Sequence, residues 1–441
     1  MNFTYLNAFP ELKKLSGYCT EAEEFAISKP NISATSARKA MEYIVKMIYF
    51  SIVTDDGGLT VFEMTTDARF VGYVNDPILI NTIHFIRKMG NVAVHEGELT
   101  KEESKKILEE LHFLVGEFCI LLGLIKDYEP FDYSGVENSI HIPTKQELYK
   151  MSEEPKKVVV ASEIIAEFAP RMRATRFQVH HGRDEEENKQ LYLKASLREA
   201  GWPLVNKADQ AMPGSAGLNM ILDDGDTVDY VLYGRDNRPL AIIEYTTTAK
   251  NLIEGRTKAI DKANKMAIKY GYKPIAYYTN GYHIYIIDQL GYKPRRVFQF
   301  HSLEELELLK LRAGSRQDIS APQIDEAIAG RDYQKKAITG ACNAFMQNRR
   351  HALLVMATGT GKTRVSIALT DVLLKAGWAK NILFLADRTS LVRQAHKNFT
   401  KLLPSVTTSV YSGGSMNRDA NARIIFSTYQ TMINLINDDT R

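Results

Sequence analysis

The chain has 441 residues, of which 44% are apolar and 25% charged, and its formal net charge is +3. These values are ordinary for a globular protein, and a chain of this length allows about two to four domains. The nearly neutral charge excludes a polybasic tail, so any nucleic-acid binding has to come from the placement of local charges.

The chain has three widely spaced cysteines, Cys19, Cys119 and Cys342, and no Cys-x-x-Cys pair. This pattern predicts buried thiols in a reducing compartment and no structural zinc. Residues 1–15 lack the apolar run of a signal peptide, and apolar runs such as residues 118–125 are too short to span a bilayer. We therefore expect a cytoplasmic protein without a membrane segment.

Residues 1–150 are expected to form a helical domain. In residues 36–53 apolar positions recur at intervals of three and four, and Ser36 stands where an N-cap would lie. The same periodicity predicts two further helices, over residues 77–89 and 100–124. Thr100 and Glu103 have the spacing of a capping box at the start of the second.

A second domain, mixed α/β, is expected over residues 155–310, after a polar candidate boundary at residues 151–157 that contains a proline. Residues 228–233 and 240–245 have the composition of strands, and the polar loop between them predicts a hairpin. A second strand pair and two helices are predicted at residues 274–278, 282–287, 187–200 and 256–270. The sheet is therefore expected to be partly antiparallel.

The third region, residues 320–441, alternates predicted strands and helices, and this order is typical of a parallel, doubly wound sheet. The predicted strands are residues 353–357, 381–386 and 423–428, and the predicted helices are residues 363–376 and 390–402. Taken together, the three regions predict a multidomain α/β protein.

A glycine-rich turn, Thr358-Gly359-Thr360-Gly361-Lys362-Thr363, joins the first predicted strand of this region to a helix. Backbone N–H groups in such a turn bind the phosphates of a nucleoside triphosphate, and glycines let the backbone approach closely. Lys362 is expected to neutralise the β and γ phosphates of ATP, and Thr363 to place its hydroxyl on Mg²⁺. The chain departs from the strict P-loop pattern at Met356, where that pattern has glycine.

Three further segments resemble motifs of superfamily 2 helicases: residues 331–334, residues 384–388 with Leu391 and Gln394, and residues 427–431. By this resemblance Gln334 would hydrogen-bond adenine, and the region would be the start of a first RecA-like helicase and ATPase domain. The alternative for Gln334 is a solvated helix residue. No Walker B acid follows the P-loop before Arg441, so we expect a fragment that binds ATP but hydrolyses it poorly and does not translocate.

Asp229 begins one predicted hairpin strand and Glu244 ends the next. Two such carboxylates can hold Mg²⁺, which activates a water for phosphodiester cleavage. The arrangement resembles the PD-(D/E)xK nucleases, which have Glu-x-Lys on the second strand, but Thr246 stands at the lysine position. Three interpretations stay open: a nuclease with a displaced lysine such as Lys250, a decayed nuclease that binds DNA, and two ordinary surface acids.

The order of the three regions resembles the R subunit of type I restriction enzymes. The stretches that resemble it are LYGRDNRPLAIIE (232–244), YYTNGYHIYII (277–287) and VMATGTGK (355–362). In the helical region, IHFIRKMGNVAVH (83–95) resembles a helical domain often fused to such subunits. The resemblance implies an ATP- and Mg²⁺-dependent motor and endonuclease that acts on double-stranded DNA with modification (methyltransferase) and specificity subunits. A nuclease-impaired DNA- and ATP-binding module, or a stand-alone helicase-like defence protein, is the alternative.

The helix after the second hairpin strand has a lysine at each position where many type I R subunits have the Gln and Tyr of Gln-x-x-x-Tyr. These are Lys258 and Lys262, so this element is expected to be missing. With Lys265 and Lys269 they recur at helical spacing, which predicts either a stripe that follows a phosphate backbone or a solvated helix face.

Overall fold

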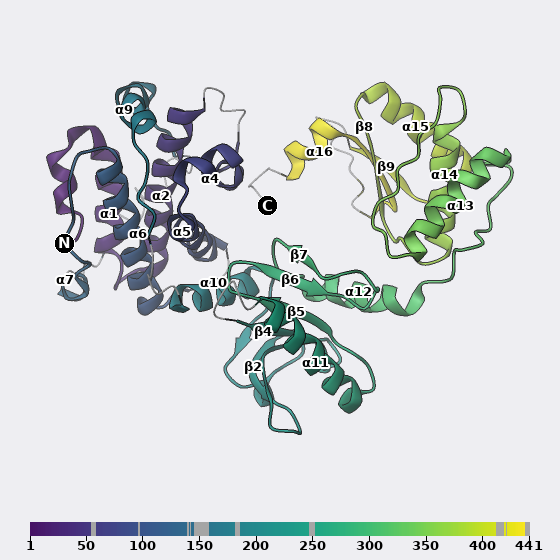
Figure 1. Ribbon diagram of the computed structural model, residues 1–441, viewed down its shortest axis with the longest axis horizontal. Helices are drawn as coiled ribbons and strands as arrows, with labels where there is room; N and C mark the ends of the chain where they lie inside the picture. Colours follow the sequence, from purple (N-terminus) through teal and green to yellow (C-terminus); the bar gives the residue numbers. More distant parts are fainter. Residues whose placement is uncertain are drawn as a thin grey trace. The chain divides into compact units, whose positions relative to one another are not determined.

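The computed structural model describes residues 1–53, 59–95, 98–138, 141, 143–144, 158–180, 186–246, 252–411, 419 and 421–436. The expected boundary at residues 151–157 and Lys250 lie outside these ranges. The chain forms two compact units. The first comprises residues 1–272, 276–286 and 296–303, and the second comprises residues 273–275, 287–295 and 304–441. Figure 1 shows both units and labels their elements.

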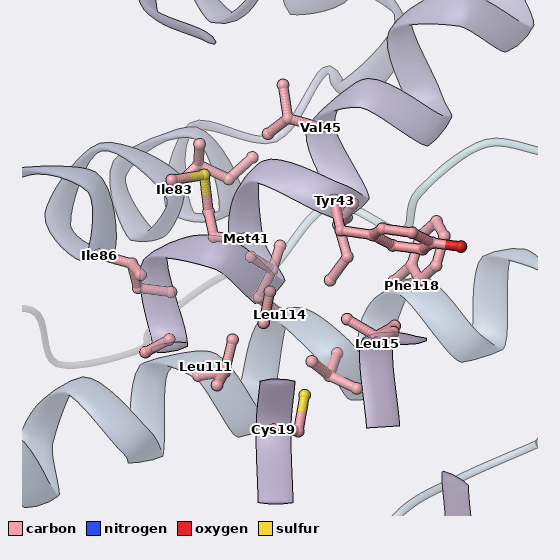
Figure 2. Packing of buried hydrophobic residues seen from close by; sticks show 14 of the residues in the cluster. Leu15, Cys19, Met41, Tyr43, Val45, Ile83, Ile86, Leu111, Leu114 and Phe118 are labelled. Carbon is pink, nitrogen blue, oxygen red and sulfur yellow. The ribbon is translucent and has the colours of Figure 1, made fainter. Parts of the chain in front are cut away.

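The first unit begins with a helical region, because its sequence places apolar residues on one face of each long helix. The helices are α1 (Lys13–Glu24), α2 (Pro30–Ile52), α3 (Val61–Thr66), α4 (Ala68–Val74), α5 (Pro77–His95), α6 (Lys101–Leu121), α7 (Tyr133–Asn138), α9 (Ser162–Ala174) and α10 (Glu186–Glu199). Helix α2 lies at the centre, packed against α1, α5, α6 and α9. Figure 2 shows side chains from α1, α2, α5 and α6 meeting in this core. The helical prediction for this part of the chain is therefore confirmed.

Of the two predicted N-terminal caps, the structure confirms the one of α6 and contradicts the one of α2. The capping box is confirmed: Thr100 Oγ1 accepts a hydrogen bond from Glu103 N at 3.2 Å, and α6 follows. The N-cap at Ser36 is wrong, because α2 begins at Pro30 and Ser36 is buried inside it, donating to Glu21 Oε2 at 2.5 Å. Proline fits the first helical turn, where its missing N–H costs nothing, and so the helix starts earlier.

A seven-stranded mixed sheet follows the helices, with its strands in chain order from β1 to β7. Its strands are β1 (Leu204–Val205), β2 (Ala216–Ile221), β3 (Thr227–Tyr233), β4 (Pro239–Tyr245), β5 (Ile275–Thr279), β6 (Ile284–Ile287) and β7 (Arg295–Val297). Strands β3 and β4 are antiparallel, as the hairpin prediction required, and Tyr230 lies opposite Ile243. Helix α11 (Leu252–Tyr270) packs on β4 and starts four residues before its predicted beginning.

The second unit contains a three-stranded parallel sheet in the order β8-β10-β9. Its elements are α12 (Leu303–Ser315), α13 (Asp332–Met346), α14 (Lys362–Lys375), β8 (Ile382–Ala386), α15 (Thr389–Leu402), β9 (Thr408–Tyr411), β10 (Ile424–Thr428) and α16 (Tyr429–Ile436). The parallel sheet is confirmed, and β9 is a strand that the sequence pattern did not predict.

The predicted strand at residues 353–357 is wrong, because this segment pairs with no strand of the described residues. Leu353 and Val355 are each 88% exposed. An apolar run becomes a strand only where a neighbouring strand accepts its backbone hydrogen bonds, and apolar periodicity does not reveal whether that neighbour is present.

The three cysteines are free and buried, as predicted. Within the described ranges, no helix is long and apolar enough to cross a membrane.

Candidate functional site

The β3–β4 hairpin brings Asp229 and Glu244 together. Extending the register of Tyr230 with Ile243 by one residue places Asp229 opposite Glu244, and both side chains line the same pocket. Glu244 is 2% exposed at the end of β4, a strand whose other residues are almost entirely buried. Asp229 Oδ2 accepts a hydrogen bond from the backbone N–H of Tyr245 at 2.7 Å. The two carboxylates are therefore neighbours in one site and not separate surface acids.

Helix α11 closes this site and contributes an amine. Lys262 Nζ lies 2.5 Å from Glu244 Oε2 and donates a second hydrogen bond to the Thr227 carbonyl oxygen, also at 2.5 Å. Its side chain is 9% exposed. Asp226, Asp229, Glu244, Tyr245, Lys258, Asp261 and Lys262 line a pocket of about 240 Å³.

Burial, two lysines and a backbone N–H set the electrostatics of the pocket. Burial raises the pKa of Glu244 to about 7, while the hydrogen bond from Lys262 acts in the opposite direction. Burial also raises the pKa of Asp229, and the Tyr245 N–H opposes this. Glu244 Oε1 is buried without a hydrogen-bond partner. A buried carboxylate oxygen without a partner is costly, and a cation ligated there would satisfy it.

The residues present fit a hard divalent cation such as Mg²⁺, which takes one or two carboxylates and keeps several waters. Glu244 Oε1 and the carboxylate of Asp229 are the oxygens that would hold it. Over the ranges that the structure describes, no group of three or more His, Cys, Asp or Glu side chains could hold a metal ion. A resident metal would therefore depend on these two acids together with water.

Thr246, at the position where the resembling nucleases have lysine, is not among the pocket-lining residues. Its backbone N–H donates to the Thr279 carbonyl oxygen at 2.9 Å, and its side chain packs against Gly255 at the start of α11. A Cβ placed on Gly255 would lie only 2.7 Å from Thr246 Cγ2, so the strand and the helix approach closely here. The strand therefore supplies no amine to the pocket.

Sequence reasoning missed Lys262 as a member of the site and took it for a lost motif position. The helical spacing of the lysines could have indicated this role, because a helix that packs on β4 turns one of the lysines on that face toward the strand. Periodicity alone could not say which one.

The phosphate-following lysine stripe on α11 stays a prediction. In the structure each of its ammonium groups is paired with carboxylates, and Lys262 is buried. Besides Lys262, the ion pairs are Lys258 with Glu254 (2.8 Å), Lys265 with Asp224 (2.7 Å), Asp226 and Asp261 (3.0 Å each), and Lys269 with Asp223 (2.6 Å). The acidic turn between β2 and β3 lies beside the helix and supplies several of these partners.

The P-loop forms the turn expected before α14. Gly359 and Gly361 have φ of 80° and 89°, values that favour glycine. Helix α14 begins at Lys362, and Lys362 Nζ donates to the carbonyl oxygens of Met356 and Ala357 at 3.2 and 3.3 Å. Thr358 is exposed, and Thr360 and Thr363 are partly buried.

Gln334 lies against this turn. It is 3% exposed, so the alternative of a solvated helix residue is wrong. Its Nε2 donates to the Thr360 carbonyl oxygen at 3.0 Å, and its Oε1 accepts from the Arg331 N–H at 3.3 Å. A Cβ on Gly361 would lie 2.6 Å from Gln334 Nε2, and the φ of 89° at this position also favours glycine.

Comparisons with known proteins match parts of this chain to restriction enzymes. Residues 327–441 match the family model "Type III restriction enzyme, res subunit". The chain is 31% identical over 185 residues to the type I restriction enzyme EcoAI endonuclease subunit of Escherichia coli, covering 39% of this chain and 22% of that protein. It is 46% identical over 65 residues to the type I EcoKI endonuclease subunit of E. coli strain K12, covering 15% and 6%. By sequence, the chain is related to type I restriction endonuclease subunits.

The matched part is only about a fifth of the length of the first of these relatives. A solved fragment assigned as an HsdR subunit of a type I restriction enzyme from Vibrio vulnificus YJ016 is 24% identical. That match covers 58% of this chain and 48% of the fragment, with a TM-score of 0.23. Because this TM-score is low, the relation to type I restriction subunits depends on the sequence matches.

Proposed function

We propose that this chain belongs to the restriction subunit of a type I restriction enzyme, which uses ATP and Mg²⁺ to translocate along double-stranded DNA and to cleave it. The observation that supports cleavage most directly is the cross-strand pair of Asp229 and Glu244 in a pocket, with Glu244 Oε1 unpartnered. In this proposal the mixed sheet with α11 is a PD-(D/E)xK-type nuclease domain, and the second unit contains the start of a RecA-like motor domain.

Asp229, Glu244 and Tyr245 each have a distinct part in the proposed cleavage. Asp229 and Glu244 hold Mg²⁺, and the ion would lower the pKa of a bound water and offset charge on the phosphate. The Tyr245 N–H holds Asp229 Oδ2, which leaves the other oxygen of this carboxylate for the ion. Burial raises the pKa of both acids, and a bound cation would favour their ionised forms.

The proposed ATP site is the P-loop turn. Backbone N–H groups of residues 358–361 and the Lys362 ammonium would bind the phosphates, and Thr363 would contact the Mg²⁺ that accompanies ATP. The Lys362 ammonium donates to two carbonyl oxygens of the same turn. Gln334 supports the turn through Thr360, and in the proposal it also contacts adenine.

The proposed partners are double-stranded DNA and the modification and specificity subunits of a type I complex. The relatives named above are endonuclease subunits of such enzymes. The main competing function is a nuclease-impaired module that binds DNA and ATP, and it is favoured by the absence of an amine on β4 at Thr246.

The experiment compares cleavage of supercoiled plasmid by the full-length protein that contains this chain, assembled with its partner subunits, in the presence of ATP and Mg²⁺. We expect Asp229→Asn and Glu244→Gln each to slow cleavage by about 100-fold or more, because each removes a metal ligand. Asp223→Asn is the matched control, since Asp223 is an exposed acid that pairs with Lys269 outside the pocket, and it should cleave at the wild-type rate. Wild-type protein that translocates but never cleaves would establish the nuclease-impaired alternative.

A further inference from the structure

We propose that Lys262, which reaches the carboxylate pocket from α11, is a catalytic residue whose ammonium contacts the scissile phosphate and stabilises the charge that develops there. The inference rests on the proposed nuclease function and deepens it. It assigns the amine of the site to the helix, at a position where the resembling nucleases do not have it.

The position of Lys262 is difficult to explain as a surface feature. Its side chain is 9% exposed, and a lysine is rarely buried unless its charge is paired. Two hydrogen bonds hold the ammonium, to Glu244 Oε2 and to the Thr227 carbonyl oxygen. An ammonium has three N–H donors, so one donor is left in a group that lines the pocket.

Neighbouring lysines on α11 do not offer the same contact. Lys258 lies on the pocket but is 54% exposed at its side chain and paired with Glu254 at 2.8 Å. Lys265 is held by three aspartates and does not line the pocket. Within the part of the chain that the structure describes, Lys262 is the lysine that contacts a proposed metal ligand.

The geometry also leaves the metal site intact. Lys262 binds Glu244 Oε2, whereas the oxygen without a partner is Oε1. The amine and a metal ion can therefore bind opposite oxygens of one carboxylate. Two positive charges then lie beside the position where a phosphate would sit, and preorganised charges of this kind stabilise a transition state in which negative charge accumulates.

The reaction is the addition of water to a phosphodiester. A P–O bond forms to the water oxygen while one P–O ester bond breaks, a proton leaves the attacking water for solvent, and the departing oxygen takes up a proton from solvent. Lys262 stays protonated throughout and contributes charge and a hydrogen bond. No redox partner or further reactant is needed.

The test uses Lys262→Gln and Lys262→Met in the full-length protein with its partner subunits. Glutamine keeps a donor for the Thr227 carbonyl without the charge, and methionine removes both. We expect plasmid cleavage to slow by about 100-fold in both variants, the range seen when one preorganised donor is removed. Mn²⁺ affinity, measured by electron paramagnetic resonance, should be unchanged or tighter, because Glu244 loses a competing partner. Lys265→Gln is the control from the same helix and should keep both properties.

The outcomes separate the inference from the proposed function. If both Lys262 variants cleave at the wild-type rate, the inference is overturned while the nuclease function stands. If the variants lose both Mn²⁺ binding and cleavage, the inference is also overturned, because Lys262 would then only maintain the structure of the site. If the wild-type protein cleaves no faster than the Asp229→Asn variant, the proposed nuclease function itself is overturned. Slow cleavage with retained Mn²⁺ binding supports the catalytic role.

Discussion

The buried pair of Lys262 and Glu244 gives a stability prediction that needs no DNA and no partner. The side chains are 9% and 3% exposed, and Nζ and Oε2 are 2.5 Å apart. Replacing Lys262 by methionine leaves a buried carboxylate without its counterion and the Thr227 carbonyl without its donor. We therefore expect Lys262→Met to be strongly destabilising in the absence of metal.

The magnitudes follow from which group each variant leaves unpaired. Breaking a buried ion pair by removing one partner costs about 3–5 kcal/mol, so Lys262→Met should cost about 4 kcal/mol. Glu244→Gln keeps an acceptor for the ammonium and should cost about 2 kcal/mol. In the double variant the Thr227 carbonyl and the buried amide introduced at position 244 are both left unsatisfied, which costs about 4 kcal/mol. The coupling energy between the two positions is then about 2 kcal/mol, outside additivity.

The assay is urea unfolding followed by the fluorescence of Trp202. The chain has two tryptophans, so a Trp378→Phe background leaves Trp202 alone. Trp202 is fully buried in the first unit, and its Nε1 donates to the His301 carbonyl oxygen at 2.8 Å. Lys269→Met is the control, because its pair with Asp223 is exposed and screened by solvent, so its loss should change the stability little. Free-energy changes at 244 and 262 that add to within about 0.5 kcal/mol would refute the reasoning.

Three further predictions address other parts of the chain. Lys362→Ala should weaken binding of a fluorescent ATP analogue at least about 10-fold, because one charged phosphate contact is worth more than about 1.4 kcal/mol. The control is Lys375→Ala, on the same helix but paired with Asp371, which should bind the analogue normally. If Lys362→Ala binds the analogue as tightly as the wild type, the P-loop site is excluded. Thr100→Ala should cost about 1 kcal/mol in urea unfolding through loss of the N-cap, whereas Thr100→Ser should be nearly neutral. Burial, with the nearby charges of Arg87, Arg296 and His283, lowers the pKa of His84 to about 3 from its ordinary 6.5. His84 is then neutral when folded, so stability falls as the pH drops below 6.5, by about 1.4 kcal/mol at pH 5.5, and His84→Gln should remove that part of the loss.

Local chemistry made much of the candidate site predictable. The hairpin was evident because two short apolar strands flank a polar loop, and antiparallel pairing then brings Asp229 and Glu244 to one face. The P-loop glycines were evident because a tight turn before a helix favours positive φ, which Gly359 and Gly361 adopt.

The rest depends on contacts between distant parts of the chain. Lys262 lies 18 residues beyond Glu244, and only the packing of α11 on β4 decides that this lysine enters the pocket. Three of the acids that pair with Lys265 and Lys269 come from the β2–β3 turn, which the helix sequence does not reveal. The segment 353–357 has the composition of a strand, but pairing, and not composition, makes a strand.

The close approach between Gly255 and Thr246 offers a way to change the pocket by a substitution outside its lining. A side chain at position 255 would meet Thr246 Cγ2 at 2.7 Å and push the first turn of α11 away from the end of β4. Lys262 lies two turns later on the same helix. The close spacing that Gly255 allows, because it has no Cβ, therefore sets how far the Lys262 amine reaches into the pocket. We therefore expect Gly255→Ala to lengthen the distance between Lys262 Nζ and Glu244 Oε2 without changing any residue that lines the pocket.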